Sequence, residues 1–123
     1  MIEVVSGMPS GTIGFRASGT VSAEDYKTTV EPALAEAVGR GGKINLLYEV
    51  GPGTSYSAGA AAQDMKTGVV IGLPHLGSFR RTALVSDEEW VTRLAHAFGW
   101  MMPGELRAFP TTGLAEAKAW LAG

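Results

Sequence analysis

The residues best placed to do chemistry lie in a polar loop between a strand and a helix. Gly53, Ser55, Tyr56 and Ser57 belong to this loop, which follows the apolar stretch Lys43–Glu49. Open α/β sheets place their sites where strands end and helices begin, because free backbone donors meet there. We therefore predict that these four residues form a recognition or switch loop.

The loop does not match the motifs of nucleotide binding or serine hydrolysis. A dinucleotide fingerprint that began at Gly51 would need glycine where the chain has Tyr56. A Walker loop needs lysine after its last glycine, but Gly59 is followed by alanine. A nucleophile elbow around Ser55 needs glycine in place of Ser57. No catalytic residue is therefore predicted.

Two interpretations of Ser57 remain open. Its hydroxyl can cap the helix expected to begin at Ala58, which is the commoner use of serine before a helix. Alternatively, Ser57 can accept a phosphate, because a helix N-terminus stabilises negative charge. Ser55 is the second candidate for phosphorylation.

Composition narrows the classes of function. The chain has 123 residues and is expected to form a single domain, 1–123. Ten basic and twelve acidic residues leave a net charge of −2, which gives no basic surface for nucleic acid. Cysteine is absent, which excludes disulfides and thiolate metal sites. No apolar stretch approaches the roughly 18 residues of a membrane span, and no signal peptide is visible, so a cytoplasmic location is expected.

Other polar residues have ordinary interpretations. His75 and His96 lack a carboxylate-rich spacing, so neither a metal site nor a cofactor is predicted. Arg80 and Arg81 open a strand, where they can bind an anion or form a solvated strand edge.

An apolar segment near the end of the chain is a second candidate surface. Trp100, Met101 and Met102 stand between glycine and proline stops. These side chains fill the core in the commoner case. If they are exposed, they form a patch for a partner protein, a second copy of the chain or a lipid.

Hydrophobic periodicity predicts the order β-β-α-β-α-β-α-β-α. The first helix has a capping box of Ser22 and Asp25 and is interrupted by Pro32. A second capping box, Ser86 with Glu89, is expected before a later helix. Strands that alternate with helices after a hairpin predict an α/β fold with a mixed, mostly parallel sheet. The predicted strands are Ile2–Ser6, Ile13–Ser18, Lys43–Glu49, Phe79–Val85 and Glu105–Phe109.

Several short segments, in this order and spacing, resemble the SpoIIAA-like family of small bacterial proteins, which is related to STAS domains and to the CRAL-TRIO fold. The segments that carry the resemblance are Gly14–Gly19, Ala23–Tyr26, Pro32–Leu34, Lys43–Glu49, Asp64–Lys66, Phe98–Phe109 and Glu116–Leu121. The resemblance implies a STAS-like α/β fold and no known enzyme activity.

The resemblance also suggests a role for the recognition or switch loop. In anti-sigma-factor antagonists with STAS domains, the phosphorylated serine lies in an Asp-Ser-Ser-Gly-type motif that opens a helix. The stretch Ser57–Gly59 keeps one serine and the glycine of that motif. We expect a non-enzymatic regulatory or protein-interaction module that binds another regulatory protein. The alternative is a domain that binds a small apolar ligand or lipid, and a homodimer is expected on general grounds.

Overall fold

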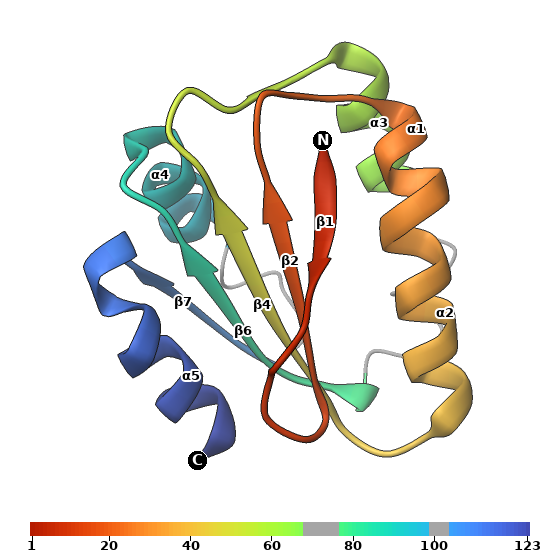
Figure 1. Cartoon of the computed structure of the whole chain (residues 1–123), viewed down its shortest axis with the longest axis vertical. Coiled ribbons are helices and arrows are strands. Elements are labelled where there is room, and N and C mark those ends of the chain that lie inside the picture. The colour runs from red at the N-terminus through yellow and green to blue at the C-terminus, as the bar shows by residue number, and fades with distance from the viewer. Residues whose placement is uncertain (68–76, 99–103) are drawn as a thin grey trace.

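Five strands form one central sheet in the computed structural model, which describes residues 1–67, 77–98 and 104–123 (Figure 1). The strand order is β1-β2-β4-β6-β7. The antiparallel hairpin of β1 and β2 is followed by parallel pairings throughout, as the sequence predicts. The strands are β1 (Ile2–Val5), β2 (Thr12–Ala17), β4 (Ile44–Val50), β6 (Phe79–Val85) and β7 (Glu105–Phe109).

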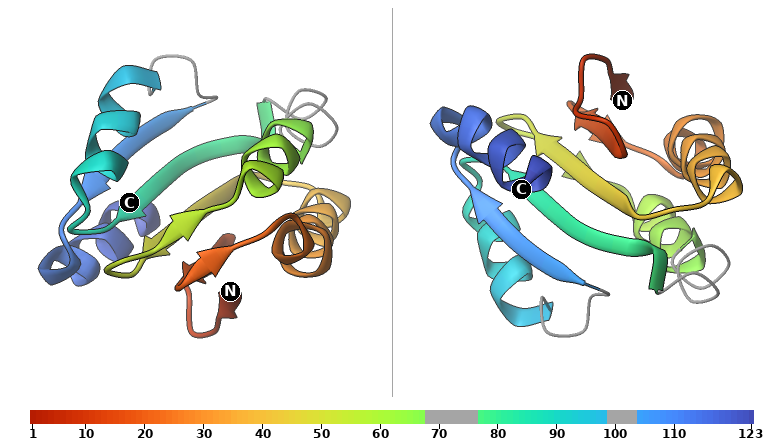
Figure 2. Two further views of the ribbon diagram at one scale, coloured as in Figure 1. Left: turned by 90° about the horizontal axis from the view of Figure 1, so that it is seen from above. Right: turned by 90° about the horizontal axis from the view of Figure 1, so that it is seen from below.

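Helices cover both faces of the sheet, as the views along it show (Figure 2). Among the described helices, α5 lies on one face, and the other four lie on the opposite face. The helices are α1 (Ala23–Asp25), α2 (Glu31–Arg40), α3 (Ala58–Thr67), α4 (Glu89–Phe98) and α5 (Leu114–Ala122).

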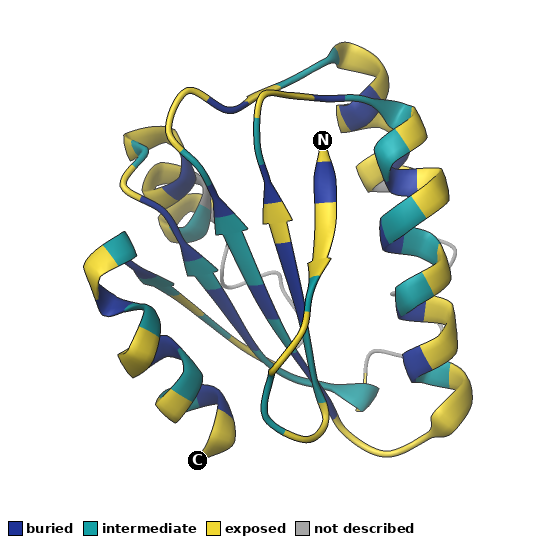
Figure 3. Ribbon diagram, in the orientation of Figure 1, coloured by how far each residue is buried: buried dark blue, intermediate teal, exposed yellow. Residues whose placement is uncertain are grey.

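The two faces have separate hydrophobic cores, and the buried stretches of the strands lie between the helix layers (Figure 3). Side chains of a strand point alternately to opposite faces. In β4, Leu46 and Tyr48 therefore pack into the core under α1–α3, while Leu47 packs into the core under α5. This alternation places the Tyr48 side chain on the same face of the sheet as Tyr56 of the recognition or switch loop.

The first helical region, 23–40, stays helical through Pro32 but contains a π-helical turn before it. Because Pro32 has no backbone donor, one regular helical hydrogen bond is missing there. One π-helical turn, Tyr26–Val30, separates α1 from α2. The predicted capping box is confirmed, since the Ser22 hydroxyl accepts from the Asp25 amide and the Asp25 carboxylate accepts from the Ser22 amide.

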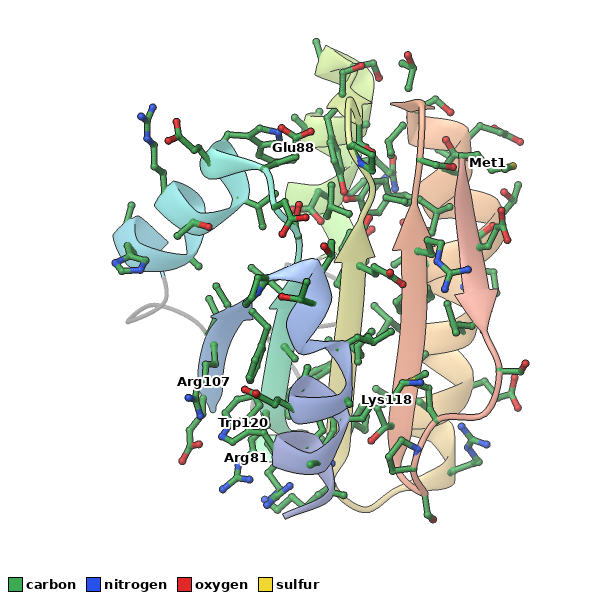
Figure 4. All side chains as sticks on the ribbon, turned by 60° about the vertical axis from the view of Figure 1, so that its left-hand side comes forward. Met1, Arg81, Glu88, Arg107, Lys118 and Trp120 are labelled. Atoms are coloured by element: carbon green, nitrogen blue, oxygen red, sulfur yellow. The ribbon has the colours of Figure 1, made fainter. Side chains whose placement is uncertain are left out.

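The last turn of α5 is fastened to the middle of the sheet. The side chains of Asn45 and Arg80 both donate to the backbone oxygen of Leu121, over 3.1 and 3.0 Å. Arg81 donates to the backbone oxygen of Trp120, and its guanidinium lies 5.1 Å from the centre of the Trp120 ring (Figure 4). Neither arginine is the solvated edge residue considered from the sequence, because both are half-buried caps of a helix C-terminus.

The buried side of α3 differs from the expected one. Spacing predicts an apolar face of Ala58, Ala62, Met65, Val69 and Leu73. The side chains of the last three lie outside the described ones, and both alanines are exposed. The buried side chains include Gln63 and Thr67 instead, which donate to the Glu31 carboxylate over 2.5 and 2.8 Å. Polar bonds across to α2 thus set the rotation of α3.

Candidate functional site

The predicted loop is held by a second, two-stranded sheet that the sequence pattern does not reveal. Ser55–Tyr56 forms β5, which pairs in parallel with β3 (Thr20–Val21). Before β5, the Thr54 hydroxyl donates to the backbone oxygen of Gly51 over 2.7 Å. Gly53 adopts a φ of 71°, a conformation that glycine favours. The loop is therefore an ordered turn that is held by hydrogen bonds.

The two serines of the loop have different environments. Ser57 is the N-cap of α3, because its hydroxyl accepts from the Ala60 amide over 3.0 Å. Ser55 is exposed, and its hydroxyl lies 3.4 Å from the Thr20 hydroxyl. A modifying enzyme would thus compete with a helix cap at Ser57 but not at Ser55.

Two residues from the start of α4 complete this edge of the molecule. The Glu88 carboxylate accepts from the Gly53 amide over 2.6 Å, and Figure 4 shows Glu88 at this end of the sheet. The Trp90 ring meets the Tyr56 ring edge-on, with centroids 5.7 Å apart. Trp90 is nevertheless 36% exposed. We call Gly53, Ser55, Tyr56 and Trp90 the edge surface.

The Glu88 contact depends on a correction to the predicted capping box. Ser86 and Glu89 do not form the predicted capping box, because α4 begins only at Glu89, which is therefore its first residue and not its third. The Ser86 hydroxyl instead accepts from the Glu88 amide over 3.1 Å. This local turn directs Glu88 toward the loop.

All three tyrosines of the chain lie close together, and Tyr56 belongs to the edge surface as well. The hydroxyls of Tyr48 and Tyr56 lie 2.7 Å apart, and the Tyr26 and Tyr56 rings are 6.5 Å apart between centroids. The Tyr26 hydroxyl also lowers the pKa of the Asp64 carboxyl. We call Tyr26, Tyr48, Tyr56 and Asp64 the tyrosine cluster. Of these four residues, the sequence predicts only Tyr56 as a site residue. The other three lie outside the predicted loop, on other elements of the fold.

The comparisons with known proteins address the whole chain. A family model described as SpoIIAA-like matches residues 12–122. The chain belongs to the SpoIIAA-like family. A similar crystal structure is that of an uncharacterized protein of the DUF3478 family with a SpoIIAA-like fold, from Shewanella loihica PV-4. It is 23% identical, with a TM-score of 0.73 over 98% of this chain and 92% of that one. A search of curated proteins gave no match.

The SpoIIAA-like fold assignment confirms the α/β class expected from the sequence. Trp100, Met101, Met102 and His75 lie outside the described residues, and His96 is exposed on α4. Across residues 1–67, 77–98 and 104–123, no three acidic or histidine side chains gather as a metal site. No helix within those same ranges has the length and apolar character needed to cross a membrane.

Burial raises the pKa values of the groups in the tyrosine cluster. Burial raises the pKa of Tyr26, Tyr48 and Tyr56, so all three phenols are protonated at neutral pH. Burial also raises the pKa of the Asp64 carboxyl, and the Tyr26 hydroxyl lowers it by a smaller amount. Part of Asp64 stays in contact with solvent, since the residue as a whole is exposed. The carboxylate is thus reachable but incompletely hydrated.

Asp64→Asn is expected to raise the melting temperature at pH 7. The folded pKa of Asp64 lies above the unfolded value of about 3.9, so the folded chain binds more protons between these values. The free energy of unfolding therefore falls as the pH rises through that window, and asparagine removes this loss. Thermal unfolding from about pH 4 to 7 should show a flatter pH profile for the variant.

Asp25→Asn is the control with the opposite sign. The hydrogen bond from the Ser22 backbone amide is the largest cause that lowers the pKa of Asp25. The stabilisation from the ionised Asp25 carboxylate is therefore present at neutral pH and lost on acidification. This variant should melt lower than the unmodified chain at pH 7. A lower melting temperature for Asp64→Asn as well would contradict the assignment of Asp64 as a poorly hydrated carboxylate.

Proposed function

We propose that this SpoIIAA-like chain is a non-enzymatic regulatory module that binds another protein through the edge surface. The observation that carries the proposal is the exposed Trp90 ring fixed edge-on against Tyr56. Tryptophan and tyrosine dominate the binding energy of many protein interfaces, because they bury a large area at a small entropic cost.

The rigidity of this surface supports the same proposal. Glu88 holds the Gly53 amide, and Ser55 and Tyr56 are fixed by pairing with β3. A surface that is ordered before binding loses less conformational entropy on association. Ser55 of this surface is exposed and therefore accessible to a kinase, and a phosphate there would add up to two negative charges. We propose Ser55, rather than the capping Ser57, as the regulated serine.

Site-specific photo-crosslinking in the native host tests the proposal. A photoreactive amino acid at position 55 should give a discrete protein adduct that excess unmodified chain competes away. The matched control places the same group at Glu116, which is exposed on α5 across the sheet. Trp90→Ala should remove the adduct from position 55. Equal labelling at both positions, or an adduct unaffected by Trp90→Ala, would contradict the proposal.

A further inference from the structure

Strand β7 is an outer strand of the central sheet. It pairs in parallel with β6, and no strand pairs with its outer side within the part of the chain that the structure describes. The Ser86 amide donates to the Phe109 oxygen over 3.0 Å, so Phe109 and every second residue before it point their backbone groups toward β6. The N–H and C=O groups of Leu106 and Ala108 therefore point outward, where another strand can pair with them.

This strand carries two opposite charges on one face. Glu105 and Arg107 lie two positions apart, so their side chains share the face of the sheet that α5 covers. The Glu105 carboxylate lies 3.2 Å from the Arg81 guanidinium and stays 64% exposed. The Arg107 guanidinium lies 5.1 Å from the centre of the Phe109 ring, which positions it at the edge of the sheet (Figure 4). Trp120 is half-buried beside that ring, with centroids 5.8 Å apart.

Arg107 differs from the other arginines of the chain in its partners. Each of the others has a carboxylate or a backbone carbonyl within 3.0–4.0 Å. Arg107 is exposed and has only the Phe109 ring among the described residues. Its N–H donors therefore remain available for a carboxylate, which a guanidinium can bind through two parallel hydrogen bonds.

We propose that a second copy of this chain supplies that carboxylate, through antiparallel pairing of β7 with its counterpart. Pairing centred on Leu106 places this residue opposite its own copy and joins the outward backbone groups of the two strands. Glu105 of each copy then lies directly opposite Arg107 of the other, with Cα atoms about 4.5 Å apart. A two-fold axis repeats this ion pair, so both guanidinium groups gain a partner.

Charge selects this register over its neighbours. A pairing centred on Arg107 would place the cation opposite its own copy, and one centred on Glu105 would do the same with the carboxylates. The register centred on Leu106 is the one that matches both charges. Because the strand is short and the ion pairs stay near solvent, we expect the association to be weak.

The inference concerns a different surface from the edge surface and does not rest on its function. Figure 4 shows Glu88 at one end of the sheet, and Arg107 and Trp120 toward the other. In the crosslinking experiment above, a second copy would be recognised by an adduct of twice the chain mass. Self-association can therefore succeed or fail whatever the outcome for another protein.

Sedimentation velocity of the isolated chain tests the pairing. Between about 5 and 500 µM, a dimer should form with a Kd of about 10–100 µM. Salt at about 1 M should weaken it, because exposed ion pairs are screened. Arg107→Glu should keep the chain monomeric over the same range. A chain that is monomeric at every concentration, or a dimer that Arg107→Glu does not weaken, would overturn the inference.

A mixture of two variants separates lost pairing from lost folding. Arg107→Glu and Glu105→Lys each place like charges opposite each other, so each variant alone should be monomeric. Mixed in equal amounts, they restore both ion pairs and should form a heterodimer. Arg93→Glu, a charge reversal at an exposed position of α4, should leave the dimer in place. Two folded variants that do not associate when mixed would contradict the proposed pairing.

Cysteine variants test the register. The chain has no cysteine of its own, so a disulfide between copies can come only from the introduced residue. Leu106→Cys would lie opposite its counterpart with Cα atoms about 5.5 Å apart, within the range that a disulfide spans. Ala108→Cys is the matched control, because its two copies are displaced by roughly 14 Å along the strands. Mild oxidation should link the first variant and not the second, and equal linking of both would overturn the register.

Discussion

Gly104→Ala is expected to reduce the free energy of unfolding by about 2–5 kcal/mol. Gly104 has a φ of 74°, which costs a residue with a side chain about 1–2 kcal/mol. A methyl group there would also lie within 3 Å of the backbone oxygens of Phe79 and Arg80. Because these atoms belong to the first residues of β6, the strand itself must shift to make room.

Gly7→Ala is the matched control for this substitution. Gly7 has nearly the same backbone conformation, with a φ of 77°, but no atom lies within 4 Å of the added methyl group. Its expected cost is the conformational term alone, about 1–2 kcal/mol. Denaturant unfolding of both variants measures the difference. Equal losses would show that β6 and Gly104 do not approach each other as closely as described.

Phe15→Ala is expected to lower the free energy of unfolding by about 3–5 kcal/mol. Phe15 is 2% exposed in the core under α1–α3, where its ring lies 6.1 Å from that of Tyr48. Removing the ring loses its transfer free energy and leaves a cavity between β2 and the helices. A domain of this size has about 5–15 kcal/mol of stability in total, so the variant would be close to unfolding at raised temperature.

Phe15→Leu separates the effect of cavity volume from a general intolerance of change. Leucine fills much of the same space, so the loss should be well below that of the alanine variant. Denaturant midpoints read at a constant m-value compare the two stabilities. Similar losses for both variants would indicate that the aromatic ring contact, and not the filled volume, is what the site requires.

The sequence predicts the fold well because its signals are local and repeated. Alternating apolar residues give β2, and the bounds of Phe79–Val85 and Glu105–Phe109 agree with the structure. The capping box of Ser22 with Asp25 and the interruption by Pro32 depend on backbone donors a few residues apart. The capping box is confirmed, and the interruption takes the form of a π-helical turn.

Predictions that depend on distant partners are less successful. Spacing favours an alanine face for α3, but the Glu31 carboxylate on another helix attracts Gln63 and Thr67 and turns the helix. Arg80 and Arg81 are read from the sequence as exposed residues, because their acceptors in the last turn of α5 are about 40 positions away. Periodicity carries no information about such polar pairs.

In the candidate site, too, local signals are predictable from the sequence and contacts between distant residues are not. The loop with Gly53 and Ser55 follows from the strand-to-helix junction alone. Tyr26 is expected on the apolar face of the first helix, and nothing in its neighbourhood indicates that its ring lies beside that of Tyr56. Only the assembled fold brings Tyr26, Tyr48, Tyr56 and Trp90 together from four different elements.

The fastening of α5 has a consequence for how the domain opens. A terminal helix usually frays from its end, since its last carbonyls have only water as a partner. Here the carbonyl of Leu121 is shared by the buried amide of Asn45 and by Arg80, and Asn45 would lose a partner if the helix lifted. We therefore expect the last turn to open together with the central strands, and the amide hydrogens at the end of α5 to exchange more slowly than those of a terminal helix without such bonds.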